Sequence, residues 1–575
     1  WLKVKRAKGR VSLGSWDYPV RAGPSQPRLR APACWRRSGG MGRCVVLAAL
    51  SLLGTCRAGD AELGSMLVEL KQLAQIQQER IAAYEALAEK QQAEASSRQL
   101  QAAQPRMKGR LTETRSYSPI ESDQLLMTHV WLLLCGALAM FMQAGFAMIE
   151  TGAGRVKNAQ IILLKNLTVV AASCLGWWSC GWSLAYSGPY SNGYKANKFA
   201  GYEQFFGRNF MIDRQDGSVD PSTDLLHWFL SWAFCSAATV IASAGVLERI
   251  NFLGSLIFAL LFSGGIYPMV VASTWGRGWL ADMNSVGYMD FAGSGIVFMS
   301  GGVASLMGTL IAGRRIGRFD ELSAKKRLTE WPKSFQPHSL PLVVMGTFIV
   351  WFGWYGIVCG AVQSMKDNEK AMLAAQVAMN TTIAAAGGGL TTFLLRTAQS
   401  RKLDIAMFCN GILAGLVSIS AGCSTVEYGP AVAIGCVGGI FYFATSLVMK
   451  IAKIDDPVDA FAVYGVPGMW GVLGAAIFDW GNSFDQVHGW QGFRCIRDAM
   501  GNCKSGGLGK DLLAANGSLI GAVFGWVAIV SAIVFLVLKV TKLLKNQQYV
   551  VDDRGEDEGI KIDYKFEDVA ANSSI

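Results

Sequence analysis

The sequence predicts an all-α polytopic membrane protein with eleven transmembrane helices. Hydrophobic residues make up 51% of the 575-residue chain, and they are concentrated in apolar segments long enough to cross a bilayer. A membrane span must satisfy its backbone hydrogen bonds internally, so such segments fold as helices, and these helices tolerate glycine. We expect the spans at residues 126–152, 160–187, 225–247, 251–273, 290–313, 340–363, 372–396, 404–421, 428–450, 461–480 and 514–539.

Basic residues follow the odd-numbered spans, which predicts the orientation. They occur at Arg155 and Lys157, in the segment 314–333, and again after the seventh, ninth and eleventh spans. Loops rich in lysine and arginine stay in the cytoplasm. We therefore expect an integral protein of the plasma membrane with an extracytoplasmic amino terminus and a cytoplasmic carboxyl terminus.

The chain before the first span divides into three expected segments. Residues 1–40 are basic and rich in Arg and Pro. We expect them to be either non-native sequence upstream of Met41 or part of a bipartite targeting leader. Residues 41–58 have a basic residue, a short apolar core and a small-residue cleavage site, the pattern of a signal peptide. Residues 59–122 predict an extracytoplasmic helical segment and a linker.

Within that segment, apolar residues recur at four-three spacing over residues 63–88, which is typical of a coiled coil of about three heptads. Several seam positions are Gln or Ala, so a solvated single helix is the alternative. The transmembrane domain is expected at 123–545, and a cytoplasmic tail at 546–575.

Charge, cysteine and histidine content exclude several function classes. The net charge of +11 comes from basic residues in short loops or near the amino terminus, so we expect no nucleic acid partner. Thirteen cysteines show no C-x-x-C pair, and the four histidines form no zinc-like cluster, so we expect no metal and no cofactor. Neither a nucleophile–base pair nor a phosphate loop is found, so we expect no enzyme. Cys495 and Cys503 share an external loop and are candidates for a disulfide.

The stretch 287–302, Gly-Tyr-Met-Asp-Phe-Ala-Gly-Ser-Gly-Ile-Val-Phe-Met-Ser-Gly-Gly, has the strongest functional signal. Asp290 stands at the mouth of an apolar run in which small residues recur at helix-neighbour spacing. Small residues let membrane helices approach closely, and an acid beside a span is costly unless it has a partner or a task. The alternative is a tightly packed helix with a capping aspartate.

Further motifs are spread over residues 123 to 550. They include Asp290-Phe-Ala-Gly, Gln143-Ala-Gly-Phe-Ala-Met-Ile-Glu150, Glu248-Arg249, Trp275-Gly-Arg-Gly-Trp279, Trp351-Phe-Gly-Trp354, Cys409-Asn-Gly and Asp455-Asp-Pro-Val-Asp-Ala-Phe461. Together these motifs resemble the ammonium transporter family (Amt/Mep/Rh). The resemblance implies eleven spans in two inverted five-helix repeats, and a homotrimer with one pore per subunit.

The resemblance also implies a substrate path. In the family, ammonium is recruited by a tryptophan face, an aromatic ring and a serine hydroxyl before two stacked phenylalanines, and two pore histidines pass the proton. Trp275 and Phe234 match the recruiting tryptophan and the outer gate ring. Asp290 matches the aspartate that shapes this site, and we expect it to accept backbone hydrogen bonds. The alternatives are an interfacial tryptophan and an ordinary core phenylalanine.

Four further family positions are substituted in this chain. Ile357 stands at the position of the family's second gate ring, and Ala361 at the position of its recruiting serine. Phe298 and Tyr464 stand at the positions of the family's two pore histidines. A phenyl ring accepts no proton, and tyrosine, with a reference pKa near 10, does not replace imidazole at neutral pH. The resemblance therefore predicts a transporter scaffold with altered pore chemistry.

Three functions remain open at this stage. The first is a transporter or channel for ammonium or ammonia. The second is a non-conducting sensor, scaffold or partner subunit. The third is a channel for another small neutral solute, which the apolar pore favours. The fold does not decide among them, because function depends on the site.

Overall fold

A computed structural model describes residues 119–186, 199–319 without 209, 214–218, 222–223, 282 and 284–286, then 323, 326, 335–478 and 509–545. The expected leader, signal peptide, coiled coil, disulfide and cytoplasmic tail lie outside these residues. Within them, helices occupy the position of every expected span. One small hairpin, which the sequence did not predict, pairs β1 (Met211–Asp213) with β2 (Val219–Pro221) in antiparallel register.

Nine helical segments of the described chain are long and apolar enough to cross a membrane. The remaining two expected spans are helical as well: α11 (Asn368–Ser400) is long but less apolar, and α12 (Ile405–Ile419) is apolar but short. The other helices are α3 (Pro119–Ala153), α4 (Ala159–Gly176), α5 (Trp182–Tyr186), α6 (Asp224–Ala244), α7 (Phe252–Leu261), α8 (Tyr267–Ser273), α9 (Ser300–Ala312), α10 (Leu340–Gly360), α13 (Tyr428–Ile451), α14 (Val466–Phe478) and α15 (Gly509–Val540).

Within the described residues, four spans contain a π-helical turn. These turns are η3 (Trp177–Gly181), η5 (Phe262–Ile266), η6 (Ser294–Met299) and η9 (Phe461–Gly465). A π turn inserts one residue into the helical ladder and is frequent at functional sites. The turns η6 and η9 contain Phe298 and Tyr464, the two positions predicted to replace pore histidines.

Several helices begin at a residue whose side chain caps the first turn. Ser339, Asp367 and Asp404 each accept a backbone N–H of the first turn of α10, α11 and α12. Such a cap satisfies one of the N–H groups that a helix start leaves without a partner. The caps therefore explain why these helices begin where they do.

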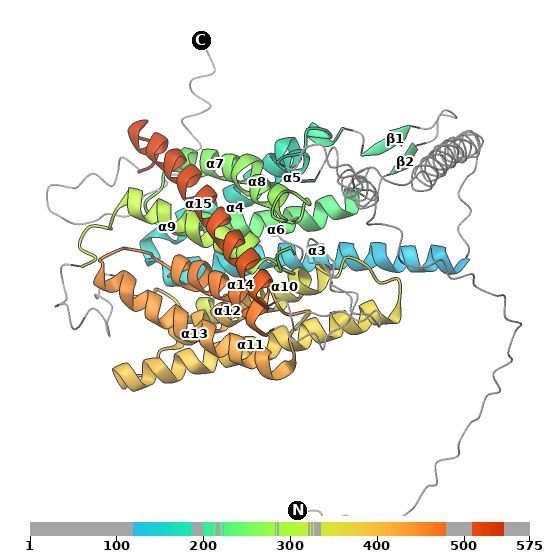
Figure 1. Ribbon diagram of the computed structural model, residues 1–575. Coiled ribbons are helices and arrows are strands. Elements are labelled where there is room, and N and C mark those ends of the chain that lie inside the picture. Colours follow the sequence, from blue (N-terminus) through green and yellow to red (C-terminus); the bar gives the residue numbers. More distant parts are fainter. Residues whose placement is uncertain are drawn as a thin grey trace, which may run out of the picture. The chain divides into compact units, whose positions relative to one another are not determined.

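Glycine lets the central helices approach closely. A Cβ added at Gly145 on α3 would lie 2.7 Å from the carbonyl oxygen of Gly346 on α10, and one at Gly302 on α9 would lie 2.4 Å from the backbone nitrogen of Gly465. These contacts are possible only without side chains. They bring α3 against α10 and η6–α9 against η9–α14, and α11 runs beside α13 at the periphery (Figure 1).

Candidate functional site

An aromatic pair stands before the π turn η6. The ring centroids of Phe234, on α6, and Trp275, just after α8, are 5.8 Å apart, and both side chains are buried. The indole N–H of Trp275 donates to the carbonyl oxygen of Asp290 at 3.0 Å. The structure thus brings together the three residues that the sequence assigned to recruitment.

Asp290 holds the start of η6 in place. Its carboxylate accepts the backbone N–H groups of Gly293 at 3.0 Å, Gly295 at 2.9 Å and Ile296 at 2.8 Å. Burial raises the pKa of Asp290 to about 6, although these N–H groups oppose the rise. The aspartate therefore has the backbone-accepting geometry expected from the sequence, and Gly293 turns the chain at φ +91°.

Three rings form what we call the aromatic centre: Phe298, Trp354 and Tyr464. Phe298 stacks on Trp354 with centroids 4.3 Å apart and planes 14° apart. The ring of Tyr464 is 6.4 Å away on a nearly parallel plane. Phe298 and Trp354 are fully buried and Tyr464 is 6% exposed. Phe298 and Tyr464, at which the family resemblance predicts substituted pore histidines, therefore lie in one apolar cluster.

The two halves of the aromatic centre are built alike. Phe298 lies eight residues after Asp290, and Tyr464 lies eight residues after Asp456. The carboxylate of Asp456 accepts the N–H of Phe461, the first residue of η9, at 2.8 Å. Burial, and then nearby Asp459, raises the pKa of Asp456 to about 6. An aspartate, a π turn and a buried ring thus occur twice in the described chain.

Ile357 and Ala361 lie one turn apart at the end of α10, where the N–H of Ala361 donates to the carbonyl of Ile357 at 3.0 Å. Both are buried, and neither side chain offers a hydrogen-bonding group. This stretch of α10 is therefore apolar at both positions.

A second set of residues forms what we call the ionic cluster: Arg155, Glu248, Arg315 and Asp455. The side chain of Arg315 donates two hydrogen bonds of 2.8 Å to Asp455 and one of 2.6 Å to Glu248. Arg155 donates to Glu248 from its backbone at 2.6 Å and from Nε at 3.1 Å. The ring centroid of Phe335 lies 4.9 Å from Cζ of Arg155 and 5.1 Å from Cζ of Arg315.

The charges of the ionic cluster compensate one another. Burial alone would raise the pKa of Glu248, but Arg315 and Arg155 outweigh it, and the pKa is lowered. In the same way Arg315 and Arg249 hold the pKa of Asp455 well below its usual range in spite of burial. Both carboxylates are thus ionised and paired at neutral pH.

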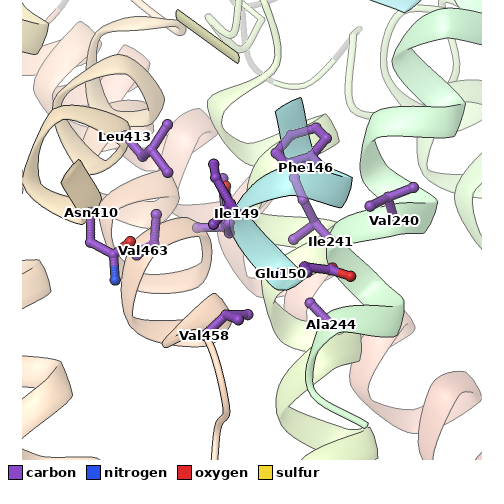
Figure 2. A pocket seen from close by; sticks show the side chains of 11 residues that line it. Phe146, Ile149, Glu150, Val240, Ile241, Ala244, Asn410, Leu413, Val458 and Val463 are labelled. Atoms are coloured by element: carbon purple, nitrogen blue, oxygen red, sulfur yellow. The ribbon is translucent and has the colours of Figure 1, made fainter. Parts of the chain in front are cut away.

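Sequence reasoning missed two features of the site. Trp354 belongs to a recognised motif, yet its stack on Phe298 depends on the crossing of two helices and is not legible in the chain. A small cavity also lies beside Tyr464, and Glu150 lines it (Figure 2). A charged residue inside an apolar span was the available signal for that cavity.

The fold and the site define a helical membrane protein with an aromatic pair, a π-turn aspartate and paired inward rings along its core. The family profile described as Ammonium Transporter Family matches residues 130–559. The chain belongs to the ammonium transporter family.

Similarity to individual proteins agrees with this. The ammonium transporter Amt2 of Archaeoglobus fulgidus is 34% identical over 365 residues, which cover 62% of this chain and 73% of the relative. Ammonium transporter 1 member 1 of Solanum lycopersicum is 33% identical over 407 residues, 68% of this chain and 78% of the relative. Among solved structures, a protein described as Sensor Amt Protein superposes with a TM-score of 0.64 and 26% identity, covering 77% of this chain and all of that one. The structure of Mep2 from Candida albicans superposes with a TM-score of 0.60 and 25% identity, covering 73% of this chain and 86% of that one.

Proposed function

We propose that this protein carries ammonia across the membrane through the core of each subunit, after ammonium gives up its proton at or above Phe234. The aromatic centre supports the proposal: a path from the aromatic pair to the small cavity beside Tyr464 would pass two apolar ring faces and one hydroxyl. Ammonia is neutral and small, and such a lining does not oppose it electrostatically.

The ion itself is disfavoured at the aromatic centre. A cation stripped of water costs several kcal/mol unless it is well paired, and the ring faces return only about 0.5–2 kcal/mol each. Each 1.4 kcal/mol of added barrier slows passage about tenfold. Passage of the intact ion is therefore expected to be slower by orders of magnitude than passage of ammonia.

A non-conducting sensor is the second candidate. Two observations favour it: the similarity to a structure described as Sensor Amt Protein over all of that chain, and the fully buried stack of Phe298 on Trp354. In that case ammonium would bind at the aromatic pair and alter the fold without crossing.

We also propose a homotrimer with its amino terminus outside. The exposed apolar side chains of α10, among them Phe348 and Phe352, provide surface that either lipid or a second subunit can cover. Particle mass in mild detergent tests the trimer, and a monomer contradicts it. Cysteine labelling of intact cells tests the orientation, and labelling of the 314–333 segment from outside contradicts it.

Uptake into proteoliposomes separates the two functions. Radiolabelled methylammonium is added outside vesicles that contain the protein, vesicles without protein, and vesicles with Trp275→Leu. Faster uptake with the protein than without it, reduced by the substitution, supports transport. Uptake equal to that of empty vesicles, together with ammonium binding to the purified protein, supports the sensor.

A further inference from the structure

A buried amide of the last span reaches the segment that precedes η6. Residues 288–293, which we call the Asp290 segment, form neither helix nor strand. They contain the carboxylate that caps η6 and the carbonyl oxygen that Trp275 binds. Asn516, near the start of α15, is fully buried against this segment. A residue far away in the sequence therefore contacts the backbone on which the aromatic pair and η6 depend.

Asn516 uses both polar groups of its amide there. Its Oδ1 accepts the N–H of Met289 at 2.8 Å, and its Nδ2 donates to the carbonyl oxygens of Met289 at 3.3 Å and of Val472 at 2.7 Å. These partners assign the two ends of the amide, because the opposite orientation would bring an N–H group against the N–H of Met289. The side chain thus joins α15, α14 and the Asp290 segment.

These bonds hold two successive peptide planes beside Asp290. The N–H of Met289 belongs to the plane before it, and its C=O belongs to the plane that links it to Asp290. With both planes held, only the rotations about the backbone bonds of Asp290 itself remain before its carbonyl group. That carbonyl oxygen accepts the indole N–H of Trp275 at 3.0 Å. The orientation of the indole ring therefore depends on where Asn516 holds Met289.

The other end of the Asp290 segment is held by a separate set of bonds. The N–H groups of Phe291 and Ala292 donate to carbonyl oxygens that follow α12, at 3.0 and 2.9 Å. Within the described residues, the backbone groups of Met289 have no hydrogen-bond partner besides Asn516. No second bond therefore takes over at Met289 when the amide of Asn516 is lost.

The packing of α15 does not require an amide at this position. Phe535 of α15 stacks on Phe258 of α7 with ring centroids 4.3 Å apart. Most of the side chains that α15 buries are apolar, among them Leu512, Leu519, Val523 and Val527. A polar group inside a membrane protein is costly unless it is hydrogen-bonded. Asn516 makes all of its hydrogen bonds to backbone, and two of the three go to Met289.

We propose that Asn516 is a positioning residue of the ammonium-binding site. By holding Met289, it directs the carbonyl oxygen of Asp290 toward Trp275. It acts through the backbone and the indole ring rather than on substrate. The inference rests on ammonium binding at the aromatic pair, which the transport and sensor candidates share, and it does not rest on conduction. Loss of the amide should let the indole ring turn away from Phe234, which weakens cation binding.

Ammonium binding to the purified protein tests this role without transport. A ligand that binds only the folded state raises the melting temperature with increasing concentration. Melting curves in ammonium chloride, with sodium chloride keeping the ionic strength constant, therefore give a dissociation constant. Asn516→Leu has nearly the same shape and none of the hydrogen bonds. We expect its dissociation constant to rise about tenfold, as loss of an outer orienting partner does at metal sites.

Trp526→Phe is the matched control on the same helix. The indole N–H of Trp526 donates to the carbonyl oxygen of Ile266 at 3.0 Å, so this variant also removes a hydrogen bond to the backbone. Its position is about 15 Å further along α15. It should lower the melting temperature without changing the dissociation constant. An unchanged constant in Asn516→Leu, or an equal increase in both variants, overturns the proposal.

A second variant covers the case in which leucine prevents folding. Asn516→Ala leaves space in which a water molecule can bond to Met289, so it should fold, and its dissociation constant should still rise several-fold. The constant of the unmodified protein in this variant overturns the proposal.

Uptake into proteoliposomes keeps the inference separate from the proposed transport. If ammonium raises the melting temperature, Asn516→Leu weakens this effect and the unmodified protein shows no uptake, the transport proposal fails and the role of Asn516 stands. If ammonium leaves the melting temperature of the unmodified protein unchanged, the role of Asn516 is overturned whatever the uptake.

Discussion

The aromatic centre and the ionic cluster are both buried, yet they are held together by opposite means. In the ionic cluster, Arg315 bridges two carboxylates through bonds of 2.6 to 2.8 Å. In the aromatic centre, Phe298 contacts Trp354 and Tyr464 through ring faces alone. The first depends on every charge keeping its partner, whereas the second tolerates a change of ring. Stability should therefore respond most to the ionic cluster, and permeation to the aromatic centre.

The largest effect is expected for Arg315→Met. Removing this guanidinium leaves Glu248 and Asp455 as underpaired buried carboxylates, which costs about 3–5 kcal/mol for a broken buried pair. We expect a large loss of folded protein, measured as the melting temperature and yield of the detergent-purified protein. The control is Arg314→Met at the exposed neighbour. An equal effect of the two substitutions would show that the cluster is not a main support of the fold.

Introducing imidazoles into the aromatic centre is the next test. Phe298→His with Tyr464→His should raise the ammonium-dependent current by an order of magnitude or more, because imidazole carries a proton near neutral pH. Phe298→Leu with Tyr464→Leu is the control for volume and should give no such current. An unchanged current in the histidine variant would place the block outside the aromatic centre, at Ile357 or Ala361.

A smaller effect is expected for Trp275→Leu. Loss of one cation–π face costs about 0.5–2 kcal/mol, so the ammonium concentration for half-maximal uptake should rise several-fold or more. The control is Trp279→Leu, since Trp279 is 40% exposed. Equal behaviour of the two variants would mean that Trp275 does not recruit substrate.

Stability should also depend on pH through both π-turn aspartates, Asp290 and Asp456, and the change is spread over about two pH units. The pKa of Asp456 is raised to about 6 in the folded protein, above its unfolded value near 3.9. Its contribution to stability is complete below about pH 4 and is lost as the pH rises through about 6. The loss is on the order of 2–3 kcal/mol. Asp456→Asn should flatten the decline of the melting temperature between pH 4 and 7, and an unaltered slope would contradict the assignment.

The two carboxylates of the ionic cluster behave in the opposite sense. Their pKa values are lowered, so their contribution is present above the unfolded values and is lost as the pH falls below about 4. Lowering the pH below about 4 should therefore reduce the stabilisation of the fold by the ionic cluster. Raising the pH toward neutral should reduce the stabilisation by the π-turn aspartates.

The spans were predictable because length and hydropathy decide them. The expected span at 428–450 is the helix Tyr428–Ile451, and that at 251–273 ends at Ser273 as found. The span expected from residue 290 begins instead at Ser294, because Asp290 and the positive φ of Gly293 form a turn before it. Local capping, rather than hydropathy, sets that boundary.

The site was predictable only where one residue type carries the chemistry. Trp275 and Asp290 were assigned from motifs, and the structure joins them by a hydrogen bond. The stack of Phe298 on Trp354 and the pair of Lys165 with Glu150 depend on how separate helices cross. Periodicity within one helix contains no information on such crossings, so these contacts required the structure.

Which species crosses the aromatic centre is the central question, and one measurement addresses it directly. Proteoliposomes with an internal pH dye are fixed to a supported membrane electrode, and an ammonium gradient is applied from outside. The account predicts a rise in internal pH that exceeds that of protein-free vesicles, with no ammonium-dependent inward current beyond theirs. A large inward current through the unmodified protein, reduced by Trp275→Leu, would contradict it, because it would show that the ion itself passes Phe298 and Tyr464.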